Sequence, residues 1–255
     1  MTKLVFKLLR IGAVIALAHP LAHILPGGSV GYAHPELRRR GAEGRSAAST
    51  HRFVSNSHFR VVHPQSLDAE AAEHVLNILE SGRRELLHRV ASCLGAGIQT
   101  RFPNLEIVIN ETTGDFVGRT GMPPWAAAAT KRNTIELQPL RLLKQRGILE
   151  TTLRHELVHV LVDTIGNGEA PRWFTEGMAL YVAGEGRRFE KQVDSLSPEK
   201  IDEALSSAKS ADEMRAAYAA AYNFVKLLIR VEGENKVWKR FADRRYSVKA
   251  ALFLR

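Results

Sequence analysis

Apolar residues recur at two different spacings along the chain, and these spacings predict its secondary structure. Short alternating runs at residues 58–63, 104–110 and 134–138 are typical of strands with one buried side. Between the first two runs, residues 66–94 carry apolar positions three and four apart, which predicts a long helix with Ser66 as its N-cap. The first half of the chain therefore combines strands with helix.

The second half has the helical spacing almost throughout. Polar turn residues interrupt it, and the predicted helices cover residues 148–165, 172–182, 202–209, 212–231 and 235–242. A half with strands and helix followed by a helical half is the order expected of an α+β fold, with a small N-terminal sheet segregated from a helical C-terminal half.

The first 33 residues have the three parts of a secretory signal peptide. Basic residues come before an apolar run at residues 11–17, and a segment of small residues ends at Ala33. The stretch from residue 11 to residue 25 has only fifteen positions, interrupted by two histidines and a proline, whereas a membrane-spanning helix needs about twenty apolar residues. The pattern therefore favours export, to a periplasm or out of the cell, with cleavage near Ala33, over a retained membrane anchor.

The rest of the chain is expected to form a leader and one domain. Residues 34–50 are rich in arginine, alanine, glycine and serine and have no apolar periodicity, which predicts a flexible leader. The domain then covers residues 51–255. Cys93 is the one cysteine in the sequence, so no disulfide can form within the chain.

The chain is basic, with a net charge of +9 that falls to +6 when Lys3, Lys7 and Arg10 leave with the signal peptide. Part of the excess lies in pairs such as Lys131 and Arg132, which are either solvated surface or a contact for an anionic envelope or an acidic substrate. Aromatic residues do not alternate with the basic ones, so nucleic acid is not an expected partner. The sequence does not indicate an oligomeric state.

One short motif carries candidate chemistry. In "HELVH", His155 and His159 are four residues apart, so on a helix both imidazoles project from one face and can reach one metal ion. A shuffled chain of this composition would contain the pattern His-Glu-x-x-His roughly once in thirty trials. The motif therefore needs support from a further ligand.

A catalytic zinc takes three protein ligands, and the third can be sought by elimination. No histidine follows His159. Asp163 is too far along the same helix, because eight helical residues rise about 12 Å, and is left as either a carboxylate that orients an imidazole or a solvated residue. Glu176 is the strongest candidate, on a separate helix reached through the turn "GNGEAP". Glu169 lies within that turn and Glu185 beyond the end of the helix, which makes both weaker candidates.

These residues match a known family. The segment "HELVH" followed by "PRWFTEGMALY" resembles the gluzincin metallopeptidases, in particular the peptidase MA-like domain of bacterial exported proteins, and the similarity extends over about residues 53–243. The resemblance implies a zincin-like fold and one zinc ion bound by His155, His159 and Glu176. It also implies that Glu156 is the general base for hydrolysis of a peptide or protein substrate. The Gly-x-Met-Glu-Asn segment of related aminopeptidases is absent, so an aminopeptidase is not implied.

Hydrolysis at such a centre also needs a donor for the developing oxyanion. Tyr222 is the first choice and Tyr218 the second, because they lie one turn apart on the predicted helix 212–231, and Tyr181 is a weaker third. Tyr222 can equally be a core residue. The strand at residues 134–138 is a candidate edge on which an extended peptide would lie.

Two other functions stay open at the level of sequence. The first is a catalytically inactive zincin-like domain that binds or scaffolds at the cell envelope. The second is the same fold without a metal, in which the histidines are structural.

Overall fold

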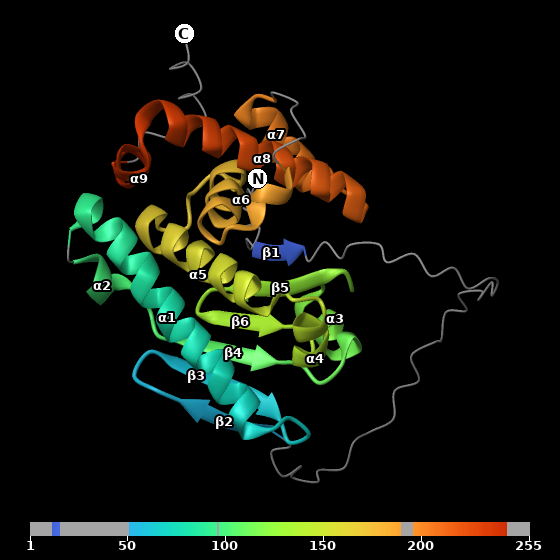
Figure 1. The fold of residues 1–255 in the computed structure, drawn as a ribbon. Helices are drawn as coiled ribbons and strands as arrows, with labels where there is room; N and C mark the ends of the chain where they lie inside the picture. Colours follow the sequence, from blue (N-terminus) through green and yellow to red (C-terminus); the bar gives the residue numbers. More distant parts are fainter. Residues whose placement is uncertain (1–11, 16–50, 96, 190–195, 244–255) are drawn as a thin grey trace, which may run out of the picture.

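Four segments of the chain are described by the structure, which is a computed structural model: residues 12–15, 51–95, 97–189 and 196–243. They form one mixed sheet with helices on its faces and a group of helices beside one of its edges (Figure 1). This arrangement confirms the predicted α+β class. The predicted leader, residues 34–50, and most of the predicted signal peptide lie outside the described residues.

The sheet has six strands in the order β1-β5-β6-β4-β3-β2. The strands are β1 (Gly12–Ile15), β2 (His51–Ser55), β3 (Phe59–Pro64), β4 (Leu105–Ile109), β5 (Ala126–Lys131) and β6 (Thr134–Leu137). β4 runs parallel to its neighbours β3 and β6, and the other neighbouring strands are antiparallel. β6 lies inside the sheet, so the prediction that this strand forms an edge is wrong.

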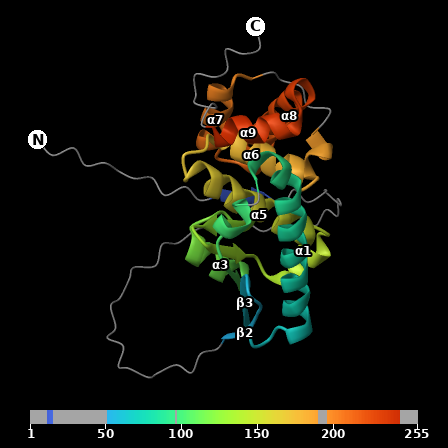
Figure 2. The same ribbon diagram turned by 90° about the vertical axis from the view of Figure 1, so that its left-hand side faces the viewer.

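Helices cover both faces of the sheet and continue beyond the edge formed by β1. They are α1 (Ala69–Leu94), α2 (Ile98–Arg101), α3 (Thr113–Thr120), α4 (Leu140–Gln145), α5 (Leu149–Gly166), α6 (Arg172–Val182), the 3₁₀ helix η1 (Glu185–Phe189), α7 (Pro198–Ser207), α8 (Ala211–Glu232) and α9 (Glu234–Ala242). Figure 2 shows α1 on one face of the sheet and α3 on the other. α6, α7, α8 and α9 form the helical group beside the edge (Figure 1).

Most predicted elements are confirmed, with their ends shifted by a few residues. The predicted helix at residues 172–182 has the bounds of α6. α1 begins later than predicted, with Asp68 at the N-cap position, while Ser66 donates a hydrogen bond to the carboxylate of Glu111, 2.8 Å away. The sequence therefore predicted this helix but not its first turn.

The glycine-rich passage before β6 contains two elements that the sequence did not predict, α3 and β5. α3 begins with a capping box, in which Thr112 and Asp115 each accept a hydrogen bond from the other's backbone N–H. β5 has the sequence "AAAATK" and is buried along its first five residues. Small side chains thus let this strand pass close to α5, the helix that carries the two histidines.

α5 is the central helix of the molecule. It contacts α1, α6 and β5, and its exposed residues are Glu150 and Asp163. A helix that is apolar on nearly all sides is expected in the core of a domain. Among the described residues, no helix combines the length and apolar character needed to cross a membrane.

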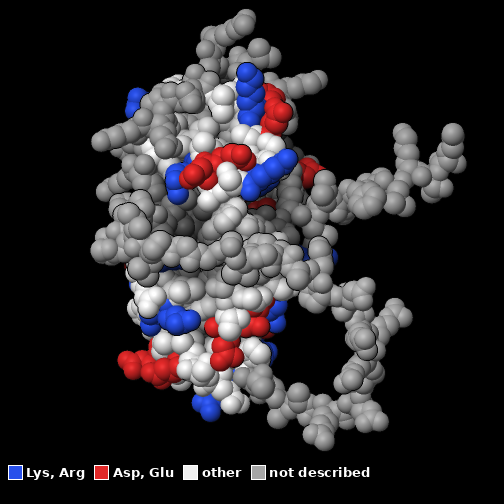
Figure 3. Space-filling view, turned by 90° about the vertical axis from the view of Figure 1, so that its right-hand side faces the viewer, with Lys and Arg blue, Asp and Glu red and all other residues white. Residues whose placement is uncertain are grey.

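Charged side chains of both signs are mixed on the surface. On the face seen in Figure 3, Lys and Arg side chains lie next to Asp and Glu side chains. Lys131 and Arg132, the basic pair singled out in the sequence, are both exposed. This mixture is typical of a solvated surface.

Candidate metal centre

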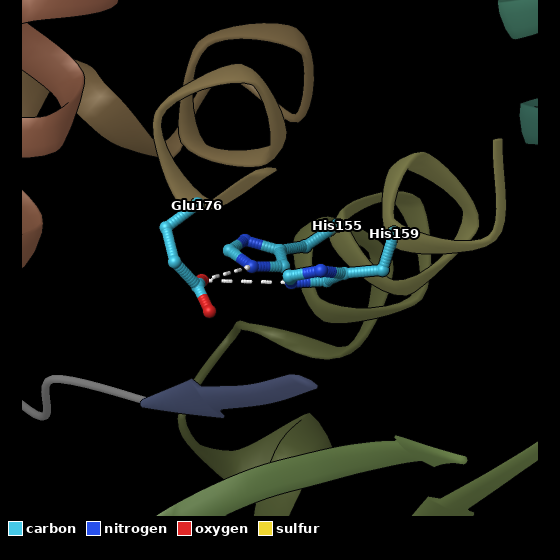
Figure 4. A group of neighbouring side chains, drawn as sticks. All are labelled: His155, His159 and Glu176. Carbon is cyan, nitrogen blue, oxygen red and sulfur yellow. Dashed lines mark ion pairs between the residues drawn. The ribbon is translucent and has the colours of Figure 1, made fainter. Parts of the chain in front are cut away.

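α5 presents two imidazoles in the same direction. His155 and His159 lie one turn apart, as their spacing predicts, with ring centroids 4.8 Å apart and ring planes inclined by 41°. Figure 4 shows both rings projecting from α5 toward the side chain of Glu176. Glu156, the residue after His155, is fully buried.

The turn after α5 returns the chain to the histidines. Asn167 and Gly168 have φ values of 52° and 73°, in the left-handed region that asparagine and glycine accept more readily than most residues. At the start of α6, the backbone N–H of Trp173 donates a hydrogen bond to Oδ1 of Asp202 on α7, 2.6 Å away. α6 is thereby held beside α5 with Glu176 facing the two histidines.

The three predicted ligands come together in the fold (Figure 4). Oε2 of Glu176 lies 3.5 Å from Nε2 of His155 and 3.5 Å from Nε2 of His159. One potential ligand atom from each residue lies within 4.8 Å of the other two. The group could therefore bind a single metal ion, with two ligands from α5 and one from α6.

The group is closed off from solvent. His155 is 0% exposed, and His159 and Glu176 are each 3% exposed. Within the part of the chain that the structure describes, Nε2 of both histidines and Oε2 of Glu176 have no hydrogen-bond partner. Buried polar atoms nearly always have one, and buried charges are paired or coordinate metals. One cation between these atoms would satisfy all three, so the residues present fit a metal ion.

The electrostatics of the site favour a positive charge. Burial by itself lowers the pKa of His155, but the carboxylates of Glu176 and Glu185 outweigh it and raise this pKa to about 10. Burial raises the pKa of Glu176, but His159 and His155 outweigh it and hold this pKa well below its ordinary value. The carboxylate therefore stays ionised, and the site attracts a cation, whether a proton or a metal ion.

Glu156 has a different partner from the three predicted ligands. Its Oε2 accepts a short hydrogen bond from the hydroxyl of Thr130 on β5, and its Oε1 has no partner among the described residues. Burial raises the pKa of Glu156, while His159, His155 and Thr130 act in the opposite direction. A buried carboxylate with a raised pKa beside a metal site is a candidate general base.

Glu185 is a residue of the site that the sequence left as a weak candidate. It is 6% exposed, and its Oε1 lies 3.4 Å from Nδ1 of His155. Nδ1 and the Nε2 that faces Glu176 are different atoms of one ring, so Glu185 contacts the histidine from another side. Asp163, the alternative partner for an imidazole, is exposed to solvent, as is Glu169.

Two buried tyrosines lie on α8. Tyr218 is close to the site, and Tyr222 packs next to η1. Burial raises the pKa of Tyr218 well above its ordinary value, and the charges of Glu176 and Glu156 add to this rise. The Tyr218 hydroxyl is therefore within electrostatic reach of both carboxylates. The ring of Tyr222 packs against Gly186 of η1.

β1 passes beside His155, His159 and Glu176, the predicted metal ligands, at the edge of the sheet. It pairs antiparallel with β5, with Gly12 opposite Thr130, and it contacts α5 and α8. Figure 4 shows this strand, in blue, crossing below the three side chains. Because Thr130 also donates to Glu156, an extended segment on this edge of β5 runs close to that carboxylate.

No known family model matches the chain, and no curated protein or solved structure matches it either.

Proposed function

We propose that this protein is an exported zinc-dependent metallopeptidase with a zincin-like fold. One observation carries the proposal: His155, His159 and Glu176 offer three buried ligand atoms within 4.8 Å of one another. Glu156 is buried on α5, the helix that also carries the two histidines. The signal-peptide pattern of residues 1–33 supports export.

Zinc suits this donor set. Two imidazoles and one carboxylate form a three-ligand set found in catalytic zinc sites. When bound, zinc would supply a Lewis acid that polarises the scissile carbonyl and lowers the pKa of water. His155, His159 and Glu176 would hold it.

Glu156 would act as the general base and then as a proton carrier. Its Oε1 has no partner among the described residues and is available to take a proton from the attacking water. Its Oε2 is held by Thr130, which keeps the carboxylate in one orientation. Because burial raises the pKa of Glu156, the carboxyl can keep the proton until it passes to the leaving amine.

A tyrosine of α8 would donate a hydrogen bond to the developing oxyanion. Tyr218 is the better supported of the two predicted candidates, because the charges of Glu176 and Glu156 act on its hydroxyl. Tyr222 remains the alternative. Its ring packs against Gly186, which also gives it a structural role.

The edge of β5 would bind the substrate by β-augmentation, in place of the β6 edge expected from the sequence. β1 supports this assignment, because an extended segment of this chain already pairs with β5 next to Thr130. A peptide on the same edge would be held by main-chain hydrogen bonds and would pass close to Glu156. We therefore expect peptides that bind in extended form to be the substrates.

Zinc content and peptide cleavage, measured together on wild-type protein and Glu156→Gln, test the proposal. The substitution keeps the side-chain size and removes the base, so both proteins should bind one zinc ion per chain. Cleavage of a mixed peptide pool should be at least about 100-fold slower in the variant. Zinc binding without cleavage by the wild-type protein would instead support a binding or scaffolding domain. If the wild-type protein binds no zinc, the metallopeptidase proposal is wrong.

A further inference from the structure

η1 brings a third acidic side chain to the candidate metal centre. α6 is followed by Gly184, whose φ of 77° turns the chain sharply. η1 (Glu185–Phe189) begins at the next residue. The carboxylate of Glu185 is consequently buried rather than solvated, with an exposed fraction of 6%.

The buried carboxylate faces the outer nitrogen of one predicted ligand. Oε1 of Glu185 lies 3.4 Å from Nδ1 of His155, a few tenths of an ångström beyond hydrogen-bond length. Among the described residues neither atom has a hydrogen-bond partner. A histidine that binds a metal through one ring nitrogen usually donates the N–H of the other nitrogen to an oxygen atom. Glu185 supplies that oxygen for His155.

Glu185 is not a fourth ligand in this geometry. Nε2 of His155 faces Glu176, whereas Nδ1 of the same ring faces Glu185. The ligand atoms that lie mutually within 4.8 Å belong to His155, His159 and Glu176. Glu185 thus acts on the predicted metal site indirectly, by orienting the imidazole of His155.

Packing against α8 fixes the position of η1. A Cβ atom at Gly186 would lie 1.9 Å from Cε2 of Tyr222, so the ring of Tyr222 rests directly on the backbone of η1. The same ring lies 6.5 Å from that of Phe189, and Nδ2 of Asn223 donates to the Phe189 carbonyl at 3.4 Å. η1 therefore has little room to move away from His155.

We infer that Glu185 is a positioning residue for the metal site and that the contact between Gly186 and Tyr222 holds it there. This inference rests on the proposed zinc site. The carboxylate fixes the His155 ring with Nδ1 protonated, which leaves the lone pair of Nε2 directed at the metal. The Tyr222 atoms nearest to the Cβ position of Gly186 are ring carbons.

The test measures zinc affinity of the purified full chain by competition with a chelator of known affinity. Glu185→Gln should weaken zinc binding about 10-fold and Glu185→Ala about 100-fold, the range found for partners of metal-bound histidines. Glu169→Gln, at an exposed glutamate of the neighbouring turn, is the matched control and should bind zinc like the wild-type protein. Circular dichroism of the metal-free proteins checks that each variant is folded.

Two further variants test the packing contact. Gly186→Ala forces the Tyr222 ring away and should weaken zinc binding as Glu185→Ala does, whereas Tyr222→Phe should leave it unchanged. The visible absorption spectrum of the cobalt-loaded protein should change in Glu185→Gln, because the His155 ligand is altered, and stay unchanged in Tyr222→Phe.

The outcomes separate this inference from the proposed function. Zinc affinity that is the same in the wild-type protein, Glu185→Gln and Glu185→Ala would overturn the role of Glu185 and leave the zinc site standing. If the wild-type protein binds no zinc, the zinc site and the role of Glu185 both fall.

Discussion

Thr130 links the proposed general base to the sheet. Its hydroxyl donates to Oε2 of Glu156, and this hydrogen bond opposes the rise in pKa that burial causes. Thr130→Val should therefore raise the pKa of Glu156 further, because the hydrogen bond that stabilises the ionised carboxylate is lost. Glu156 must be ionised to act as a base, so the acidic limb of the pH profile of kcat/KM should move to higher pH.

The matched control for this prediction is Thr130→Ser, which keeps a hydroxyl and should keep the acidic limb near its wild-type position. Both profiles are measured with one peptide substrate and saturating zinc. An acidic limb that stays in place or moves to lower pH in Thr130→Val would show that Glu156 is not the group that titrates.

The two tyrosines of α8 can be separated by removing one hydroxyl at a time. Tyr218→Phe should lower kcat by about 100-fold, because a donor to the oxyanion is lost, with zinc content unchanged. Tyr222→Phe should keep most of the activity, because it retains the ring that packs against Gly186. Loss of activity in Tyr222→Phe alone would restore the choice made from the sequence.

Helix geometry is the part of the predicted metal site that the sequence could reveal. The period of a helix is enough to bring His155 and His159 to one side, and a turn followed by a helix is enough to return Glu176. Glu185 follows no such period. Its position depends on a single 3₁₀ turn and on a contact with α8, a helix later in the chain, and no local pattern encodes that contact.

At the scale of elements, α6 and α8 pack closely beside Glu176, a predicted ligand. A Cβ atom at Gly177 would lie 2.5 Å from the carbonyl oxygen of Ala221 and 2.5 Å from Cγ2 of Val225. Gly177→Ala should therefore push the two helices apart and lower the free energy of unfolding by about 1–3 kcal/mol or more. Displacement of the adjacent Glu176 should also weaken zinc binding.

Gly118→Ala is the matched control for that substitution. Gly118 is exposed on α3, and a Cβ atom there would meet nothing within 4 Å. Alanine is the better helix former, so this variant should be more stable than the wild-type protein by up to about 1 kcal/mol. Urea unfolding of both metal-free variants measures the difference, and equal stabilities would contradict the close packing of α6 on α8.

The sequence predicted the elements whose apolar residues recur at a regular spacing. It missed the elements that form because other parts of the chain pack against them. The helices from α5 to α9 carry apolar positions at the helical spacing, so their existence follows from the sequence. β5 consists mainly of alanine, which has a low strand propensity and no alternation with polar residues. It becomes a strand because β6 pairs with it and α5 covers it.

At the scale of the whole molecule, the N-terminal segment of the uncleaved chain, which removal of the predicted signal peptide would take away, would compete with the substrate for one edge. β1 pairs with β5 where a peptide is expected to lie. The double variant Ala13→Pro/Val14→Pro removes the backbone N–H groups of both residues. Backbone N–H groups point to alternate sides along a strand, so one of these two points toward β5. Loss of one hydrogen bond of about 1 kcal/mol should speed peptide cleavage by the full chain about fivefold.

The control for this prediction is Ala13→Val/Val14→Ala, which exchanges the two side chains and keeps both N–H groups. It should cleave peptides at the wild-type rate. Equal rates for the proline variant and the wild-type protein would show that β1 does not restrict access to β5. Cleavage by residues 34–255, which lack β1, gives a second comparison and should be faster than cleavage by the full chain.

The central claim is that one metal ion joins α5 to α6 through His155, His159 and Glu176. X-ray absorption at the zinc edge, recorded on the full chain loaded with one equivalent of zinc, tests it most directly. We predict two imidazole nitrogens at about 2.0–2.1 Å with oxygen filling the remaining positions, and loss of one oxygen ligand in Glu176→Ala. A spectrum without histidine ligands, or one that is the same in Glu176→Ala, would contradict it.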